Sequence, residues 1–229
     1  RNNNATWIFE QHSHHPSELF ELRSYLTAKL LWNPDLDANE IINEFVQGYY
    51  AEAGKYVKKY IDVIHEEIQK DKDFFLFLYG DPAQAFNSFL NPELLKQYNT
   101  YFDDAEKVVE NKPNVLQRVR TSRISTDYAM LEMARNGKSP DFQLLENGKI
   151  SKDVELRVSR FKESCQNSNI TLMNEMGYTV EEYLALFEKT LQRAAIPNLA
   201  KGKKVTLHTQ PKKYAAENPQ ALTEGALGG

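Results

Sequence analysis

Apolar residues recur at intervals of three and four along most of this chain, which is the spacing of one face of an α-helix. The first such segment, residues 16–32, carries leucines at this spacing: Leu19, Leu22, Leu26 and Leu30. Pro16 suits the first position of a helix, because the amide hydrogen that proline lacks has no partner there. The pattern therefore predicts a helix from Pro16 to Trp32.

A sharp turn follows in the stretch "KLLWNPDLD", residues 29–37. Pro34 cannot continue the helix and biases Asn33 away from helical backbone angles. Asp37 can cap the next helix, with Glu40 three residues later as in a capping box. We interpret Trp32, at the corner, as an anchor that packs the two helices against each other or against a neighbouring domain. Trp32, Pro34 and Asp37 are thus predicted to be structural residues, and truncating a buried Trp32 to alanine should cost about 3–5 kcal/mol.

Further helical patterns continue to residue 195, and several have recognisable ends. They are residues 37–68, as one helix or as two that meet near Gly48 or Gly54; residues 91–109, opened by Asn91-Pro92-Glu93; residues 115–136, closed by Asn136-Gly137; a helix capped by Ser151; and a helix opened by the capping box Thr179–Glu182. The predicted fold class is therefore all-α, a multi-helix bundle of six or seven helices.

Three segments depart from this pattern. The apolar stretch from Phe74 to Pro82 has no period, and we expect it to be buried irregular chain followed by a turn. Residues 5–11, "ATWIFEQ", are typical of a short buried strand, and Val205 and Leu207 alternate with polar residues as in another strand. Because neither strand has partners nearby in the sequence, both are predicted to be remnants of neighbouring domains.

Composition and charge exclude some classes of function. The 229 residues carry a formal net charge of −4 and have a pI near 5.8, so no basic excess exists for holding nucleic acid. No apolar run reaches the roughly 20 residues that cross a bilayer, so no membrane span is expected. The single cysteine, Cys165, excludes an internal disulfide.

Candidate chemistry is sparse. Glu10 and Gln11 follow the strand-like run, where barrel enzymes place polar groups that face substrate, although the residues alone favour an ordinary polar strand end. His12, His14 and His15 lack the spacing of a metal motif, so we favour an ordinary solvated loop and predict no metal. No nucleophile elbow, phosphate loop or dinucleotide fingerprint occurs, and no cofactor is predicted.

Two groups of side chains have both a structural and a binding interpretation. Four tyrosines could stack on sugar rings, but their helical spacing favours core positions with hydroxyls directed to water: Tyr49, Tyr50, Tyr56 and Tyr60. Three arginines of one helix face acidic residues of the preceding helix: Arg118, Arg120 and Arg123 opposite Asp103, Asp104 and Glu106. We interpret these charges as a solvated face, with phosphate or uronate recognition as the alternative.

Two long segments carry a family resemblance. They resemble the helical region after the catalytic-type barrel in a family of largely uncharacterised bacterial proteins related to alpha-glucuronidase-like glycoside hydrolases: "ELRSYLTAKLLWNPDLDANEIINEFVQGYY" (residues 21–50) and "YFDDAEKVVENKPNVLQRVRTSRISTDYAMLE" (residues 101–132). The tail "VTLHTQPKKYAAENPQALTEGALGG", residues 205–229, resembles the opening of a discoidin-like carbohydrate-binding sandwich. Ala51 departs from the family pattern, in which glycine is expected after the paired tyrosines.

The resemblance implies three parts. Residues 1–12 would end a barrel, residues 13–200 would form the helical domain, and residues 201–229 would be a linker and the first strand of a sandwich. The implied function is a supporting helical region of a multidomain protein acting on complex carbohydrate, inactive alone, with Glu10, Gln11 and His12 near the substrate. It also implies export to the periplasm, cell surface or medium, and it identifies no catalytic carboxylate here.

Two other hypotheses remain. The first is a non-catalytic helical module that binds glycans or other proteins, without a catalytic parent. The second, which we rank last, is a metal-dependent enzyme built on the N-terminal histidines. The sequence upstream of Arg1 distinguishes the first from the supporting role, because a barrel with paired carboxylates would appear as repeated alternation of strands and helices.

Overall fold

The predicted all-α fold is confirmed. A computed structural model describes residues 7–10, 16–77, 80–137, 139–174, 177, 179–196, 199 and 203–204. Seven α-helices lie within these residues: α1 (Phe20–Trp32), α2 (Ala38–Tyr50), α3 (Gly54–Lys70), α4 (Pro92–Val108), α5 (Pro113–Asn136), α6 (Lys152–Asn167) and α7 (Val180–Ala194). None of the helices in this part of the chain is both long and apolar enough to cross a membrane.

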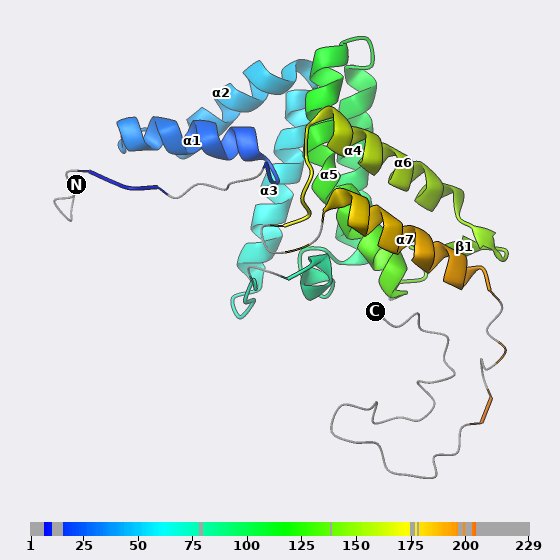
Figure 1. Ribbon diagram of the computed structural model, residues 1–229. Coiled ribbons are helices and arrows are strands. Elements are labelled where there is room, and N and C mark those ends of the chain that lie inside the picture. The colour runs from blue at the N-terminus through cyan, green and yellow to red at the C-terminus, as the bar shows by residue number, and fades with distance from the viewer. Residues whose placement is uncertain are drawn as a thin grey trace.

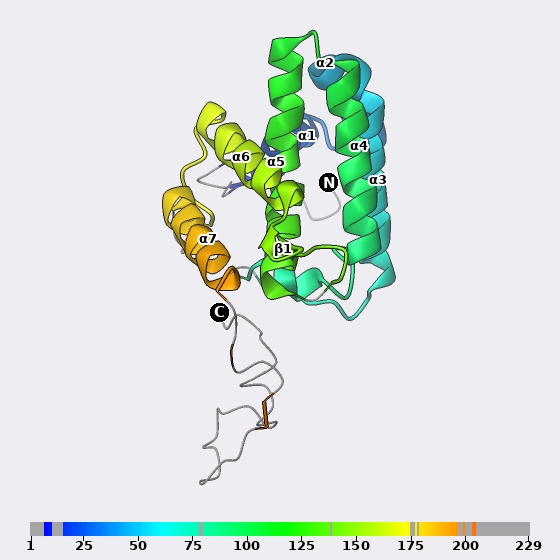
Figure 2. The ribbon, with the colours of Figure 1, turned by 90° about the vertical axis from the view of Figure 1, so that its right-hand side faces the viewer.

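The helices form two parts, which we call the arm and the bundle. The arm is the hairpin of α1 and α2, which projects to one side in Figure 1. The bundle comprises α3 to α7, and its longest helix, α5, contacts both α4 and α6. Figure 2 shows α3 and α4 on one side of α5 and α6 and α7 on the other. The arm joins the bundle through contacts of α2 with α3 and α5.

The joint between arm and bundle lies next to Gly54, one of the two glycines near which two helices were predicted to meet. A 3₁₀ turn, η1 (Ala51–Ala53), separates α2 from α3. Gly54 is required there, because a Cβ atom at this position would lie 2.4 Å from the carbonyl oxygen of Val46. Ala51, where the resemblance led us to expect glycine, adopts φ 48° and ψ −126°, a conformation that favours glycine. The chain therefore turns sharply at a position whose side chain opposes the turn.

Helix ends follow the predicted signals with two exceptions. Asn91 caps α4, Gly137 closes α5 in the left-handed conformation, and Thr179 and Glu182 form a complete capping box. The start of α1 was predicted wrongly: the helix begins at Phe20 rather than Pro16, after Leu19 in the left-handed conformation. Ser151 precedes α6 as predicted, but its hydroxyl donates to Glu146 Oε1 at 2.9 Å instead of accepting from the helix.

A short hairpin precedes α6 and was not predicted. It pairs β1 (Leu145–Glu146) with β2 (Lys149–Ile150) in antiparallel register. Asn147 and Gly148 connect the strands with φ values of 52° and 75°. Two consecutive residues with positive φ are typical of the turn that Asn-Gly favours.

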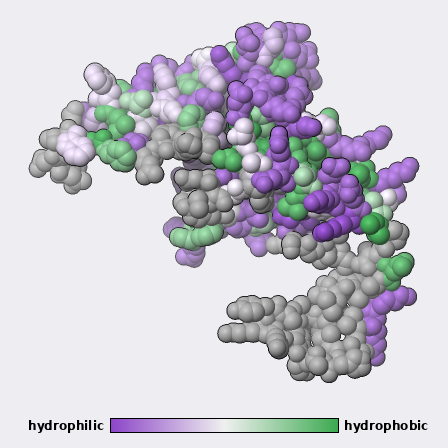
Figure 3. All heavy atoms as spheres, in the orientation of Figure 1, coloured by the Kyte–Doolittle hydropathy of each residue, from purple (hydrophilic) through white to green (hydrophobic). Residues whose placement is uncertain are grey.

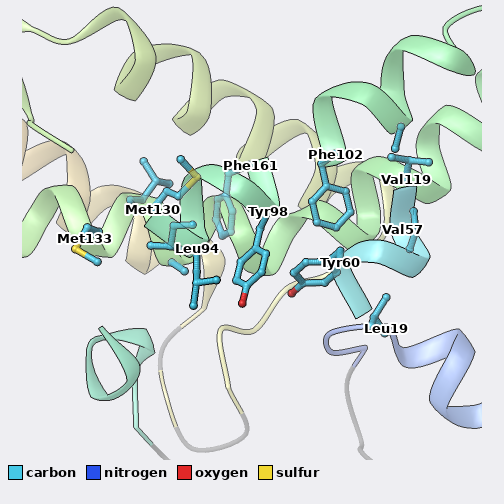
Figure 4. Close-up of a cluster of buried hydrophobic side chains, with 14 of the residues drawn as sticks. Leu19, Val57, Tyr60, Leu94, Tyr98, Phe102, Val119, Met130, Met133 and Phe161 are labelled. Carbon is cyan, nitrogen blue, oxygen red and sulfur yellow. The ribbon is translucent and has the colours of Figure 1, made fainter. Parts of the chain in front are cut away.

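Aromatic residues dominate the centre of the core. Tyr60 packs with ring-centroid distances of 5.1 Å to Tyr98 and 4.9 Å to Phe102, and Figure 4 shows these three rings together. A second aromatic group joins α5, α6 and α7 and includes Tyr128, Phe161, Tyr183 and Phe187. Offset and edge-on contacts of this kind add to the stabilisation from buried area alone.

The aperiodic segments differ from their predictions. Phe75, Leu76 and Phe77 are exposed rather than buried, although Asp81 caps the predicted turn by accepting from the amide of Ala83 at 2.8 Å. Residues 7–10 belong to no strand, and Trp7, Ile8 and Phe9 are exposed. The predicted strand at Val205 and Leu207 lies outside the described residues.

Candidate functional site

Exposed apolar side chains collect where α1 turns into α2, at the free end of the arm. Leu31, Trp32 and Leu36 are 46%, 92% and 40% exposed. Figure 3 shows apolar surface at this end of the molecule, whereas the surface over the upper bundle is largely hydrophilic. We call these three residues the arm tip. The described residues of the N-terminal segment add three more exposed apolar side chains, Trp7, Ile8 and Phe9.

The apolar residues of α1 do not form one stripe. Leu22 is buried, and Tyr25 lies with its ring centroid 5.4 Å from that of Phe45 on α2. Leu31 and Trp32 lie outside this contact and are exposed. A helix that is apolar around its circumference is normally covered on more than one side. Within the described chain α1 is covered by α2, so part of its apolar surface remains open.

Trp32 does not pack α1 against α2. Its exposure of 92% contradicts that half of the prediction. The physical reason is that α1 ends at Trp32 and the next residue, Asn33, is extended, so the indole lies beyond the last contact between the helices. Packing of Trp32 against a neighbouring domain stays a prediction.

The other two structural residues act as predicted. Pro34 follows the end of α1 by two residues. Asp37 accepts hydrogen bonds from the amides of Asn39 at 2.7 Å and Glu40 at 3.1 Å, so it caps α2. Asn33 adds a local bond, since its side-chain oxygen accepts from the amide of Asp35 at 3.1 Å. The tip is therefore a defined turn that presents Trp32 outward.

Only one of the predicted substrate residues lies within the described part of the chain. Glu10 is described and exposed. Gln11 and His12, like His14 and His15, lie outside the described residues. Among the residues described, no three His, Cys, Asp or Glu side chains are grouped closely enough to hold a metal ion.

Arg123 is buried whereas Arg118 and Arg120 are half-buried, so the interpretation of the arginine cluster as a solvated face is wrong for Arg123. Arg123 is 2% exposed and pairs with Glu106 at 2.7 Å and with Asp103 at 2.6 Å. Its second Nη donates to Asn99 Oδ1 at 2.6 Å. Because α5 lies between the other helices, the face that carries Arg123 is turned into the bundle rather than to water.

A buried aspartate extends this network to α6. Asp127, 1% exposed, accepts from Arg157 at 2.8 Å and from Arg160 at 2.6 and 2.7 Å. Arg157 also pairs with Asp153 at 2.9 Å, and it shares Asn99 with Arg123. Carboxylates of this chain thus occupy the guanidinium groups, which supports a structural role for the cluster over recognition of phosphate or uronate.

Two of the four tyrosines differ from the prediction that their hydroxyls face water. The Tyr50 hydroxyl lies 2.7 Å from Ser122 Oγ, and Tyr60 donates to Glu18 Oε1. Burial raises the pKa of both phenols, so they remain protonated at physiological pH. Tyr49 is half-buried and lies 4.5 Å from the guanidinium of Arg118, a cation–π contact. These contacts make the tyrosines part of the joint between arm and bundle.

Cys165 is not equipped to be a nucleophile. It is 1% exposed. Desolvation, with a smaller contribution from Asp127, raises the pKa of its thiol to about 12. The thiolate is the reactive form, so this side chain behaves as a small apolar core residue.

Similarity to known proteins adds little about chemistry. A family model described as a domain of unknown function, DUF4838, matches residues 1–62. That range contains the arm and the first half of α3, and it is well under half of the chain. No curated protein and no solved structure matches the chain.

Proposed function

We propose that this chain is a supporting helical region of a multidomain, glycoside-hydrolase-like protein that acts on complex carbohydrate. In this proposal the arm docks onto the preceding barrel, and the bundle holds the arm in position. Catalysis belongs to the barrel, and the chain alone is inactive. Export, and a carbohydrate-binding sandwich after residue 200, belong to the same proposal.

The observation that carries the proposal is the exposed apolar surface of the arm. Trp32 is the most exposed large apolar side chain on any described helix, and Leu31 and Leu36 flank it. Apolar side chains that cluster on the surface, rather than occurring singly, mark sites of interaction with other folded surfaces. The Asp37 cap fixes the turn, so the tip is presented as a defined shape.

Two similarities cover this same region. The resemblance to the helical region of barrel glycoside hydrolases rests in part on residues 21–50, and the DUF4838 model matches residues 1–62. Glu10 follows directly on the exposed residues Trp7, Ile8 and Phe9. If these apolar residues pack into a barrel, Glu10, with Gln11 and His12, comes to lie at the contact between the domains.

The test compares the 229-residue chain with the full parent protein. Both are assayed on a panel of polysaccharides and uronic-acid glycosides, with release of reducing sugar as the measurement. We expect activity from the parent and none from the chain. Hydrolysis by the isolated chain would contradict the supporting role.

A second measurement separates this proposal from the glycan-binding alternative. The isolated chain is titrated with the oligosaccharides that the parent cleaves, and binding heat is recorded. A supporting region binds none of them, whereas a helical glycan-binding module binds them without help from the barrel. Specific binding by the chain alone would therefore favour the alternative.

A further inference from the structure

A pocket of about 270 Å³ lies where the segment before α1 meets the bundle. Residues 16–21 form one side, and the others are formed by α3, α5 and α6 together with residues near 82–90 and 170–180. Its walls are mainly apolar and include Ile124, Phe161 and Met173. A cavity of roughly 150 Å³ in a protein core is enough to accept benzene. The pocket thus has room for one ring and a substituent.

Small side chains of α5 leave this space open. Three of the residues of α5 that line the pocket have small side chains: Ser122, Ser125 and Ala129. The Ser122 hydroxyl is already engaged, because it lies 2.7 Å from the Tyr50 hydroxyl and donates to the carbonyl oxygen of Arg118. Protein interiors are normally packed without voids of this size. Small residues alone do not make a site, so the polar groups of the pocket decide what it can bind.

The polar end of the pocket is formed by three side chains from three elements. Tyr60 of α3 donates its hydroxyl hydrogen to Glu18 Oε1, which fixes the carboxylate at the pocket. Thr126 of α5 is 2% exposed, and its Oγ1 lacks a hydrogen-bond partner of normal geometry within the described chain. The Thr126 hydroxyl is nevertheless close enough to Tyr60 to lower the pKa of that phenol. A buried hydroxyl without a good partner is costly unless something binds to it.

The Glu18 carboxyl is the acidic group at this end of the pocket. Desolvation is the largest influence on the pKa of the Glu18 carboxyl and raises it, opposed by Tyr60, His65 and Arg23. Glu18 as a whole is nevertheless exposed, so water still reaches part of this residue. A positive charge placed against it would offset the lost hydration.

We propose that this pocket binds a small primary amine with an apolar body, whose ammonium group meets the Glu18 carboxylate and the Thr126 hydroxyl. The body lies among the apolar walls, as in most small-molecule sites. An ammonium group supplies three donors, and Glu18 and Thr126 together offer acceptors for them. A sugar fits poorly, because its hydroxyls would face apolar walls on several sides. This site is separate from the arm tip and does not depend on the proposed docking.

The experiment uses three probes that share one ring and differ in one group: benzylamine, benzyl alcohol and benzoate. Each is titrated into the 229-residue chain, and binding is followed by the methyl signals of Met173 and by calorimetry. We expect benzylamine to bind about tenfold or more tightly than benzyl alcohol, because a hydrogen bond to a charged group is stronger than one between neutral groups. Benzoate should not bind, because its charge repels that of Glu18.

Two variants and one control localise the binding. Glu18→Gln should weaken benzylamine by about tenfold or more and leave benzyl alcohol nearly unchanged, since only the charge is removed. Ser125→Leu should weaken both probes by occupying the pocket. Glu40→Gln removes an exposed carboxylate of α2 that does not line the pocket and should change neither. Circular dichroism establishes that each variant is folded.

Three results would overturn the proposal. They are equal affinity of the original chain and Glu18→Gln for benzylamine, retention of both probes by Ser125→Leu, and failure of benzylamine to bind the folded chain at millimolar concentration. Inactivity of the parent protein on carbohydrates would instead count against the proposed function and leave the pocket unaffected.

Discussion

The arm and the bundle place charged and apolar side chains in opposite ways. The bundle buries Arg123, Asp127 and Arg157 at 2%, 1% and 4% exposure, whereas the arm exposes Leu31 and Trp32. Buried charges are stable only when they are paired, and those of the bundle are paired with each other. Apolar side chains stabilise a protein when they are removed from water, and those of the arm tip gain little of this stabilisation within the described chain. The buried charges of the bundle are therefore satisfied within it, whereas the proposed function requires another domain to cover the arm tip.

The joint between the two parts shows the same division. Tyr50, at the end of α2, and Tyr60 of α3 are both buried, and their hydroxyls are bonded to Ser122 and Glu18. Between these tyrosines the chain passes through the positive φ of Ala51. The arm is thus held firmly at its base through buried contacts, while its tip is held only by the hairpin itself. Four changes can break or sharpen this comparison.

The largest effect is expected in the bundle, at Asp127. Replacing it with alanine leaves Arg157 and Arg160 without their shared acceptor, and Arg157 is buried. Removing one partner of a buried ion pair costs about 3–5 kcal/mol, and we expect a loss of that size in the free energy of unfolding by urea. Asp104→Ala is the matched control, since Asp104 is exposed. It should stay within about 0.5 kcal/mol of the original chain. Equal, small losses in both variants would show that the bundle does not depend on its buried charges.

The second effect is expected at the joint, with Ala51→Gly. The change removes the side chain that opposes φ 48° and ψ −126°, so the variant should unfold at higher urea concentration. Relief of backbone strain of this kind amounts to about 1 kcal/mol or more. Ala53→Gly is the control, because Ala53 has ordinary helical angles of −73° and −19°. It should lose about 1 kcal/mol through backbone entropy. Destabilisation by both glycines would mean that the joint is not strained.

The third effect is smaller and depends on pH. Hydrogen bonds from the backbone and side chain of Thr179 lower the pKa of Glu182 from its ordinary value of 4.5. Because the folded pKa is the lower one, the ionised carboxylate stabilises the bundle above pH 4.5, and this contribution is lost as pH falls through the folded pKa. The urea midpoint of Glu182→Gln should thus lie below that of the original chain at pH 7 and approach it at pH 3. A constant difference between the two midpoints would show that the charge is not responsible.

Local signals were sufficient to predict much of the fold. Pro34, Asp37, Asn91, Gly137 and Thr179 each act within a few residues, so their positions reveal where helices begin and end. The hairpin at residues 145–150 was also detectable, because Asn147-Gly148 is a strong turn signal between short strands. The start of α1 could not be predicted in this way, since Leu19 takes a left-handed conformation that no local preference of leucine favours.

The environment of charged and aromatic side chains was less predictable. Arg123 and Asp127 are four residues apart, as are Asp153 and Arg157, and this spacing occurs on exposed helices as well as buried ones. One signal was present: Val119, Arg123 and Met130 share a face of α5, so charge falls within an apolar stripe. Trp32 offered no such signal, because its surroundings depend on what covers the arm. The pocket near Glu18 brings together residues from distant parts of the chain, and neither their spacing nor their types indicates it.

The smallest effect is expected at the arm tip, with Trp32→Ala in the isolated chain. A side chain that is 92% exposed removes little apolar area from water on folding, so the free energy of unfolding should change by less than about 0.5 kcal/mol. In the parent protein the same substitution should lower the thermal midpoint, because the indole would be buried against the barrel. Leu156→Ala is the control, since Leu156 is 63% exposed on α6 of the bundle. It should be neutral in both proteins. A Trp32 substitution that is neutral in the parent as well would mean that the tip is not covered by the barrel, and the exposed tryptophan would then have to serve a ligand or another protein.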